Sequence, residues 1–175
     1  EAAHRRIDAD HCASSGSRKV EICLGDYVDR GPDSARVVQL LLDRARTHEI
    51  VPLRGNHEQV LLQFLAEEAG LSDWAPLGGL STLVSYGVDP RDLRSSEARS
   101  IFSAALPREH LAFFMRTWAH CQFGRYLFVH AGIRPGVAID RQVDADLLWI
   151  RDEFLAWRDA FDWVVVHGHT PVEEP

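Results

Sequence analysis

The amino-acid sequence predicts a single domain of the α/β class, which some schemes would count as α+β. Short apolar runs alternate with stretches in which apolar residues recur at helical spacing. The first two runs and the helical stretch between them fit within the roughly 30 residues of a βαβ unit, so their strands should be parallel. Each apolar run also ends in a polar cluster, at the strand ends where α/β sheets place ligands.

Composition narrows the class of protein further. With 175 residues, of which 46% are hydrophobic, the chain is long enough for one domain with its own core. Its formal charge of -7 argues against general nucleic-acid binding, which needs a basic surface. Three cysteines without a CxxC pair predict neither a disulfide framework nor a thiolate zinc site. We therefore expect a cytoplasmic protein, and no apolar run approaches the roughly 20 residues of a membrane span.

Four strands and the helices between them can be placed along the chain. The later part of a helix is expected over residues 1–11, and a helix capped by Asp33 or Ser34 should follow the first strand. Another helix follows the second strand and ends near Gly70, and residues 107–118 and 139–157 have helical spacing. The predicted strands cover residues 20–24, 49–53, 126–129 and 163–166.

Residues 71–121 differ from the rest of the chain, because Gly and Pro repeatedly interrupt short helical patterns there. We expect a helical insert within the single domain of residues 1–175. Its aromatic residues should pack in the core; the alternative is that Trp74 or Tyr86 lines a substrate groove.

The polar clusters share one chemistry. Asp26, Asn56, His130 and His169 each follow a predicted strand, and His57 lies beside Asn56. Carboxylate, amide oxygen and imidazole together suit a borderline divalent ion such as Mn, Fe or Zn. Such an ion lowers the pKa of a bound water toward neutrality.

Four blocks of sequence resemble the signature blocks of calcineurin-like metallophosphoesterases. They are Gly25-Asp26-Tyr27-Val28-Asp29-Arg30-Gly31, Gly55-Asn56-His57-Glu58, His130-Ala131-Gly132 and Gly168-His169-Thr170-Pro171. The most similar branch is the bacterial serine/threonine protein phosphatases. The resemblance implies a β-sandwich-like core flanked by helices and two divalent metal ions, manganese first, with iron or zinc as alternatives. Asp26 would bridge the two ions, while Asn56, His130 and His169 would bind the second.

The resemblance also implies a catalytic pair and two phosphate-binding residues. His57 would be the general acid that protonates the leaving alkoxide, and Asp29 would orient it. Arg30 would hold phosphate oxygens, and Arg151 resembles the second phosphate-binding arginine of the family. The implied reaction is direct attack of a metal-bound hydroxide on phosphorus, without a phosphoenzyme. His167 is expected as a supporting group beside the metal rather than as a ligand.

The sequence departs from this family at both ends. The family's first block, Gly-Asp-x-His-Gly, carries further ligands of the first metal and is absent, and the chain stops after the last histidine block. We expect the 175 residues to be a fragment that lacks this block and the C-terminal strands. Such a fragment should be unstable or weakly active by itself.

Three functions fit the sequence. The first is a metal-dependent hydrolase of phosphoproteins or phosphopeptides, which the acid at Asp29 favours. The second is a symmetrical dinucleoside polyphosphate hydrolase of the same superfamily. The third is a non-catalytic remnant that binds one metal ion or a partner protein. The sequence predicts no oligomeric state.

Overall fold

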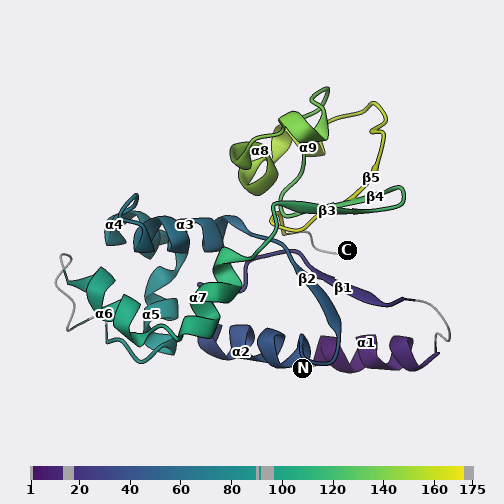
Figure 1. The fold of residues 1–175 in the computed structure, drawn as a ribbon. Helices are drawn as coiled ribbons and strands as arrows, with labels where there is room; N and C mark the ends of the chain where they lie inside the picture. The colour runs from purple at the N-terminus through teal and green to yellow at the C-terminus, as the bar shows by residue number, and fades with distance from the viewer. Residues whose placement is uncertain (1, 14–17, 90, 92–96, 172–175) are drawn as a thin grey trace.

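The fold consists of two small β-sheets with a lobe of helices beside them (Figure 1). A computed structural model describes residues 2–13, 18–89, 91 and 97–171. In the first sheet, β1 (Val20–Cys23) pairs in parallel with β2 (Glu49–Pro52). In the second, β4 (Tyr126–Val129) lies between β3 (His120–Phe123), which is antiparallel to it, and β5 (Val164–Val166), which is parallel. The predicted mixed α/β class is confirmed.

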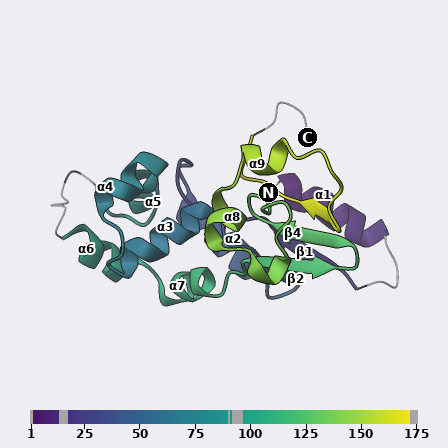
Figure 2. The ribbon, with the colours of Figure 1, turned by 90° about the horizontal axis from the view of Figure 1, so that it is seen from above.

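The helices form three groups along the chain. Figure 2 shows the middle group extending to one side of the sheets. The first group is α1 (Ala2–Ala13), α2 (Ser34–Arg44) and α3 (Asn56–Leu65). The middle group, called the helical lobe below, is α4 (Leu71–Trp74), η1 (Ala75–Leu77), α5 (Gly79–Ser85), α6 (Ala98–Ala105) and α7 (Arg108–Met115). The last group is η3 (Ile139–Arg141), α8 (Asp144–Trp149) and α9 (Asp152–Leu155).

Backbone hydrogen bonds connect the two sheets. The N–H of Trp118 donates to the Pro52 carbonyl at 2.9 Å, and the N–H of Arg54 donates to the Trp118 carbonyl at 2.7 Å. The segment that leads into β3 therefore pairs with the end of β2. Beyond the ends of β4 and β5, the N–H of Gly168 donates to the His130 carbonyl at 2.8 Å. The His130 ring in turn donates to the Leu24 carbonyl, after β1, at 2.6 Å and so links the second sheet to the first. These bonds bring the carboxyl ends of β1, β2, β4 and β5 to one region.

Two apolar clusters form the core. The larger one lies among α2, α3 and the helical lobe and contains fully buried aromatic side chains, namely Phe64, Trp74, Phe102 and Phe114. The smaller one packs α8 and α9 against the second sheet through residues such as Leu127, Leu148 and Phe154. Burial of apolar side chains at these two places supplies most of the driving force for folding.

Some predicted elements differ from the observed ones. Strand β3 was not predicted, because His120-Cys121-Gln122-Phe123 is neither an apolar run nor a clear alternation. It forms because the turn at Gly124, whose φ is 57°, folds it back onto β4 as a hairpin. Residues 139–157, which have helical spacing, do not form one continuous helix but three short helical segments. Trp74 and Tyr86 pack among the helices as expected, and Trp74 is fully buried.

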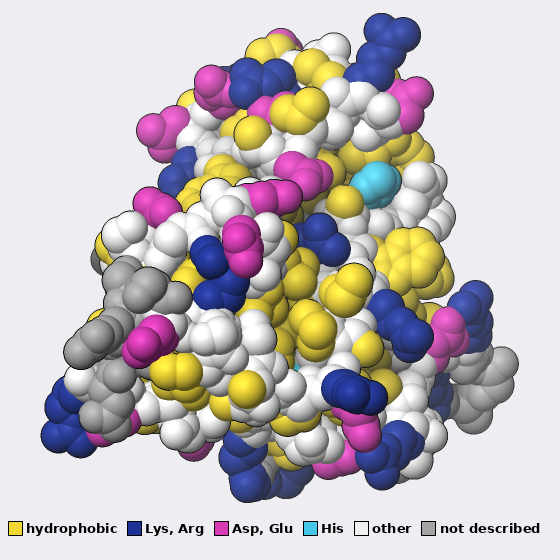
Figure 3. Space-filling model, turned by 60° about the vertical axis from the view of Figure 1, so that its left-hand side comes forward, with side chains coloured by type: hydrophobic (Ala, Val, Ile, Leu, Met, Phe, Trp, Pro, Cys, Tyr) yellow, Lys and Arg dark blue, Asp and Glu magenta, His cyan; other side chains and the backbone are white. Residues whose placement is uncertain are grey.

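The side of the molecule shown in Figure 3 carries charges of both signs around a central group of hydrophobic side chains. Several large apolar residues of α5, α6 and α7 are exposed, including Val84, Ile101 and Met115. Within the described part of the chain, none of the helices has the length and apolar character needed to cross a bilayer.

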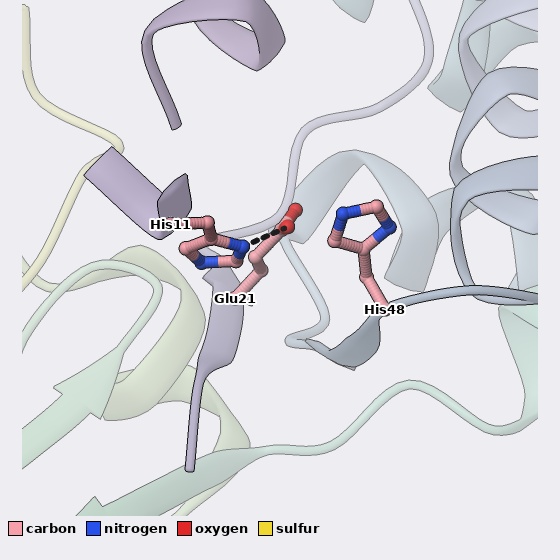
Figure 4. A group of neighbouring side chains, drawn as sticks. All are labelled: His11, Glu21 and His48. Atoms are coloured by element: carbon pink, nitrogen blue, oxygen red, sulfur yellow. Dashed lines mark ion pairs between the residues drawn. The ribbon is translucent and has the colours of Figure 1, made fainter. Parts of the chain in front are cut away.

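A nearly buried ion pair anchors β1 to α2 and α1. The guanidinium of Arg44 donates to both oxygens of Glu21, at 2.6 and 2.7 Å, and to Asp8 at 2.7 Å. Figure 4 shows the Glu21 carboxylate between the rings of His11 and His48, with His11 Nδ1 at 3.9 Å. The hydrogen bond from Arg44 lowers the pKa of Glu21 against the opposing effect of burial.

Replacing Arg44 by Met should destabilise the fold by about 3 kcal/mol, because the Glu21 carboxylate is then left without its partner in a nearly buried position. Urea unfolding at pH 7 measures this. The matched control is Arg46→Met, which removes an exposed ion pair with Asp43 and should change the unfolding free energy by less than about 0.5 kcal/mol. Similar losses in both variants would contradict a special role for the Glu21 pair.

Candidate active site

Three side chains meet at a single point between the two sheets. Asn56 is the first residue of α3, His130 follows β4, and His169 follows β5. Their ligand atoms form a triangle: His130 Nε2 lies 3.0 Å from Asn56 Oδ1 and 3.1 Å from His169 Nδ1, and the last two atoms are 3.0 Å apart. Two ligand atoms that sit at right angles around an ion, each about 2.1 Å from it, are about 3 Å apart. The triangle therefore has the dimensions of a metal site.

The backbone fixes which nitrogen of His130 faces this point. Its Nδ1–H donates to the Leu24 carbonyl at 2.6 Å, so Nε2 carries the lone pair. Burial lowers the pKa of His130. Burial also lowers the pKa of His169 to about 4, and the neighbouring His130 and Arg151 act in the same direction. Both imidazoles are thus neutral at pH 7, the form that binds a cation.

Asp26 completes the group. Its Oδ1 lies 3.4 Å from His130 Nε2, and Asp26, His130 and His169 together have the spacing of a metal-binding cluster. Asp26 has a φ of 58°, a left-handed backbone conformation that residues with a side chain rarely adopt. It is exposed, so an ion and a substrate can both reach it.

Glu58 holds the two loops of the site together. Its carboxylate is fully buried and accepts backbone N–H groups of Gly55 at 2.8 Å, Asp26 at 2.9 Å, Tyr27 at 2.6 Å and Val28 at 3.3 Å. The loop after β1 is thereby tied to the start of α3. The loops also approach closely at glycines, since a Cβ on Gly25 would lie 2.5 Å from the Gly55 nitrogen. Burial raises the pKa of Glu58 to about 7, and the Asp26 charge adds to this while the backbone N–H groups oppose it.

His57 and Asp29 form a buried pair beside the metal ligands. His57 Nδ1 lies 2.7 Å from Asp29 Oδ2, and the Asp29 side chain is 0% exposed. Burial would lower the pKa of His57, but the hydrogen bond with Asp29 and the charges of Asp26 and Asp29 outweigh it and raise the pKa. His57 therefore holds its proton more firmly than a free imidazole does, which suits a proton donor.

Both predicted phosphate-binding arginines are exposed at the site. The charge of Arg30 acts on His57, and that of Arg151 acts on His130 and His169. Arg151 also donates from Nη1 to Thr170 Oγ1 at 3.3 Å. His167, by contrast, packs its ring edge-to-face against Phe154 at 4.9 Å and is not among the grouped ligands.

The described residues fit a divalent ion. Two neutral imidazole nitrogens, an amide oxygen and a carboxylate lie around one point, and this mixed set suits a borderline cation. The described residues contain a second group with suitable atoms, made of His11, Glu21 and His48. There the carboxylate is already bound on both oxygens by Arg44, whose positive charge disfavours a cation.

The sequence did not predict Glu58 or Thr82 as part of the site, and for Trp74 it offered only the alternative of lining a substrate groove. Glu58 lies three residues after Gly55, the spacing by which an acid caps the start of a helix, so a capping pattern was the available signal. Trp74 and Thr82 both hydrogen-bond to Asp29. They lie 45 and 53 residues away in the chain, and nothing local in the sequence links them to it.

This geometry is typical of a metal-dependent hydrolase, and comparison with known proteins identifies the family. A model of the calcineurin-like phosphoesterase family matches residues 8–175. The chain therefore belongs to the calcineurin-like phosphoesterases, a family of hydrolases that generally bind divalent metals. A crystal structure of a protein proposed to be a diadenosine tetraphosphatase is similar in fold, with a TM-score of 0.59 and 19% identity over 93% of this chain and 68% of the other.

Replacing Glu58 by Gln should destabilise the protein by about 2–4 kcal/mol, because one amide oxygen cannot accept all the N–H groups that the carboxylate accepts. Urea unfolding at pH 7 measures the change. Glu68→Gln, at an exposed position on the segment after the same helix, is the control and should cost less than about 0.5 kcal/mol. Equal effects would mean that Glu58 does not organise the loops.

The pH dependence of stability should depend on His169. Its folded pKa of about 4 lies below the unfolded value of about 6.5, so the unfolded chain binds more protons between these values. The contribution of His169 to stability is complete above about pH 6.5 and is lost as the pH falls toward 4. Comparing metal-free wild type with His169→Gln by thermal unfolding from pH 7.5 to about 4 tests this. The variant should have a flatter profile; parallel profiles would contradict the assignment.

Proposed function

We propose that this chain hydrolyses phosphate monoesters, with phosphoproteins or phosphopeptides as the substrate class. The observation that carries the proposal is the buried pair of His57 and Asp29, 2.7 Å apart and adjacent to the grouped ligands. An ester of serine or threonine has an alkoxide as its leaving group, which is a strong base and needs a proton as the bond to phosphorus breaks. An acid with a raised pKa beside the site supplies that need.

The residues divide the work of the reaction among them. Asn56, His130, His169 and Asp26 would hold a divalent ion; as implied by the family, a second ion would share Asp26, with manganese as the first candidate for both. Bound ions would neutralise phosphate charge and make a nucleophile available from water at neutral pH. Arg30 and Arg151 would hold the nonbridging oxygens of the phosphate.

The proton balance follows from these positions. As the new P–O bond forms on one side, the ester P–O bond breaks on the other, and the leaving oxygen takes the proton of His57. The products are an alcohol and inorganic phosphate. His57 then recovers a proton from solvent, while Asp29 holds the ring in place throughout.

A second candidate is the hydrolysis of dinucleoside polyphosphates, and the comparison with solved structures favours it more than the first. The structural neighbour is a proposed diadenosine tetraphosphatase. Symmetrical cleavage of that substrate would release ADP, a good leaving group that needs little help from an acid. The buried Asp29–His57 pair is what favours the first candidate over this one.

A substrate panel with Mn²⁺ decides between the two. We expect a phosphoserine peptide to be turned over faster than diadenosine tetraphosphate, and His57→Asn to lower kcat on the peptide by about 10²–10³-fold. Faster release of ADP from diadenosine tetraphosphate, with little effect of His57→Asn, would support the second candidate. Turnover of neither substrate, together with one bound ion or none, would support a non-catalytic protein that binds a single metal ion or a partner protein.

A further inference from the structure

The Asp29 carboxylate has more partners than the catalytic pair requires. Besides His57, the indole Nε1–H of Trp74 donates to both of its oxygens at 3.1 Å, and the Thr82 hydroxyl donates to Oδ1 at 2.6 Å. Trp74 and Thr82 are both 0% exposed. A carboxylate buried this deeply is costly unless donors surround it, and each donor also restricts how it can turn.

Thr82 clamps Asp29 from two directions. Its hydroxyl oxygen accepts the backbone N–H of Asp29 at 2.9 Å while its O–H donates to the carboxylate of the same residue. Ser34 Oγ lies 3.2 Å from the same N–H and 3.3 Å from the Thr82 hydroxyl. Backbone and side chain of Asp29 are thus held together, although Asp29 has a left-handed φ of 71°.

The helical lobe is built to bring these donors to the loop. Between α4 and α5 the chain turns at Gly78, where φ is 105° and a Cβ would lie 2.6 Å from the Arg30 nitrogen. At the next residue, a Cβ on Gly79 would lie 2.5 Å from the Trp74 ring. The Trp74 ring also packs against Phe64 and Phe102, at centroid distances of 5.0 and 5.4 Å. Two adjacent glycines therefore let this turn pack closely against both the loop at Arg30 and the ring of Trp74.

We infer that Trp74 and Thr82 are positioning residues, which hold the Asp29 carboxylate in the orientation that lets His57 deliver its proton to the leaving group. The inference rests on the proposed hydrolysis of phosphate monoesters. Neither residue touches the substrate, since both are enclosed by the helical lobe. Because Trp74 and Thr82 act on proton transfer, the loss of kcat on replacing them should be larger for a leaving group that needs a proton more.

Two substrates that differ in the leaving group test this. Phenyl phosphate releases a basic phenolate, whereas para-nitrophenyl phosphate releases a weakly basic one. We expect Thr82→Val to lower kcat on phenyl phosphate by about 10-fold or more and to leave kcat on para-nitrophenyl phosphate and both KM values within about twofold. Thr82→Ser, which keeps the hydroxyl, should retain kcat on phenyl phosphate near the wild-type value. Trp74→Phe, which removes the indole N–H, should show part of the loss seen in Thr82→Val.

Thr117→Val is the matched control. Thr117 is also buried, and its hydroxyl bonds Phe114 and Arg54 rather than Asp29. This variant should lower thermal stability, and any change in kcat should be the same for phenyl phosphate and para-nitrophenyl phosphate. Equal losses on both substrates in Thr82→Val, or no loss at all, would overturn the positioning role.

A measurement without turnover separates this inference from the proposed function. In ¹⁵N-histidine NMR, the proton on His57 Nδ1, assigned by its absence in His57→Asn, should resonate far downfield because it is shared with Asp29. Thr82→Val should move it upfield or broaden it, and Thr82→Ser should keep it. An unchanged resonance in both Thr82→Val and Trp74→Phe would overturn the inference, even if both substrates are hydrolysed. If wild type hydrolyses neither substrate, the proposed function fails, and the resonance alone decides the positioning role.

Discussion

The site depends first on the buried carboxylate of Glu58. Its oxygens accept N–H groups from the start of α3 and from three successive residues of the loop after β1. A parallel strand pair brings two loops to the same edge of a sheet, but it does not fix their distance. Glu58 fixes it, and so sets Asp26 and Asp29 beside Asn56 and His57. An acceptor group placed at a junction in this way orders backbone that has no regular secondary structure of its own.

The second level of organisation comes from the helical lobe. Its turn at Gly78 and Gly79 is shaped against Arg30 and Trp74 rather than against solvent. Through Trp74 and Thr82, a lobe that contributes no metal ligand among the described residues still contacts the carboxylate that orients His57. Apolar packing of Trp74 against Phe64 and Phe102 is therefore part of the polar geometry of the site, because the same ring serves both.

The sequence predicted the parts of the fold that local patterns encode. The parallel pairing of β1 and β2 followed from the length of the unit between them, and Asn56, His130 and His169 followed from their positions at strand ends. Strand β3 escaped prediction because its extended conformation comes from pairing with β4 and not from the pattern of its own residues. The division of residues 139–157 into short helices, with Arg151 out of helical conformation between α8 and α9, was also beyond local patterns. The contacts of Trp74 and Thr82 with Asp29 join distant segments and required coordinates.

The ligand triangle takes Asn56 from the side of the first sheet and two histidines from the second. An ion at its centre would act as a cross-link between the halves of the molecule, in addition to the backbone bonds around Trp118. Losing that cross-link would weaken the contact between the two halves before the strands within each half separate, because each apolar cluster lies within one half. Ion binding and the cohesion of the two halves would then be a single equilibrium, so a chain depleted of metal would also be a more open molecule.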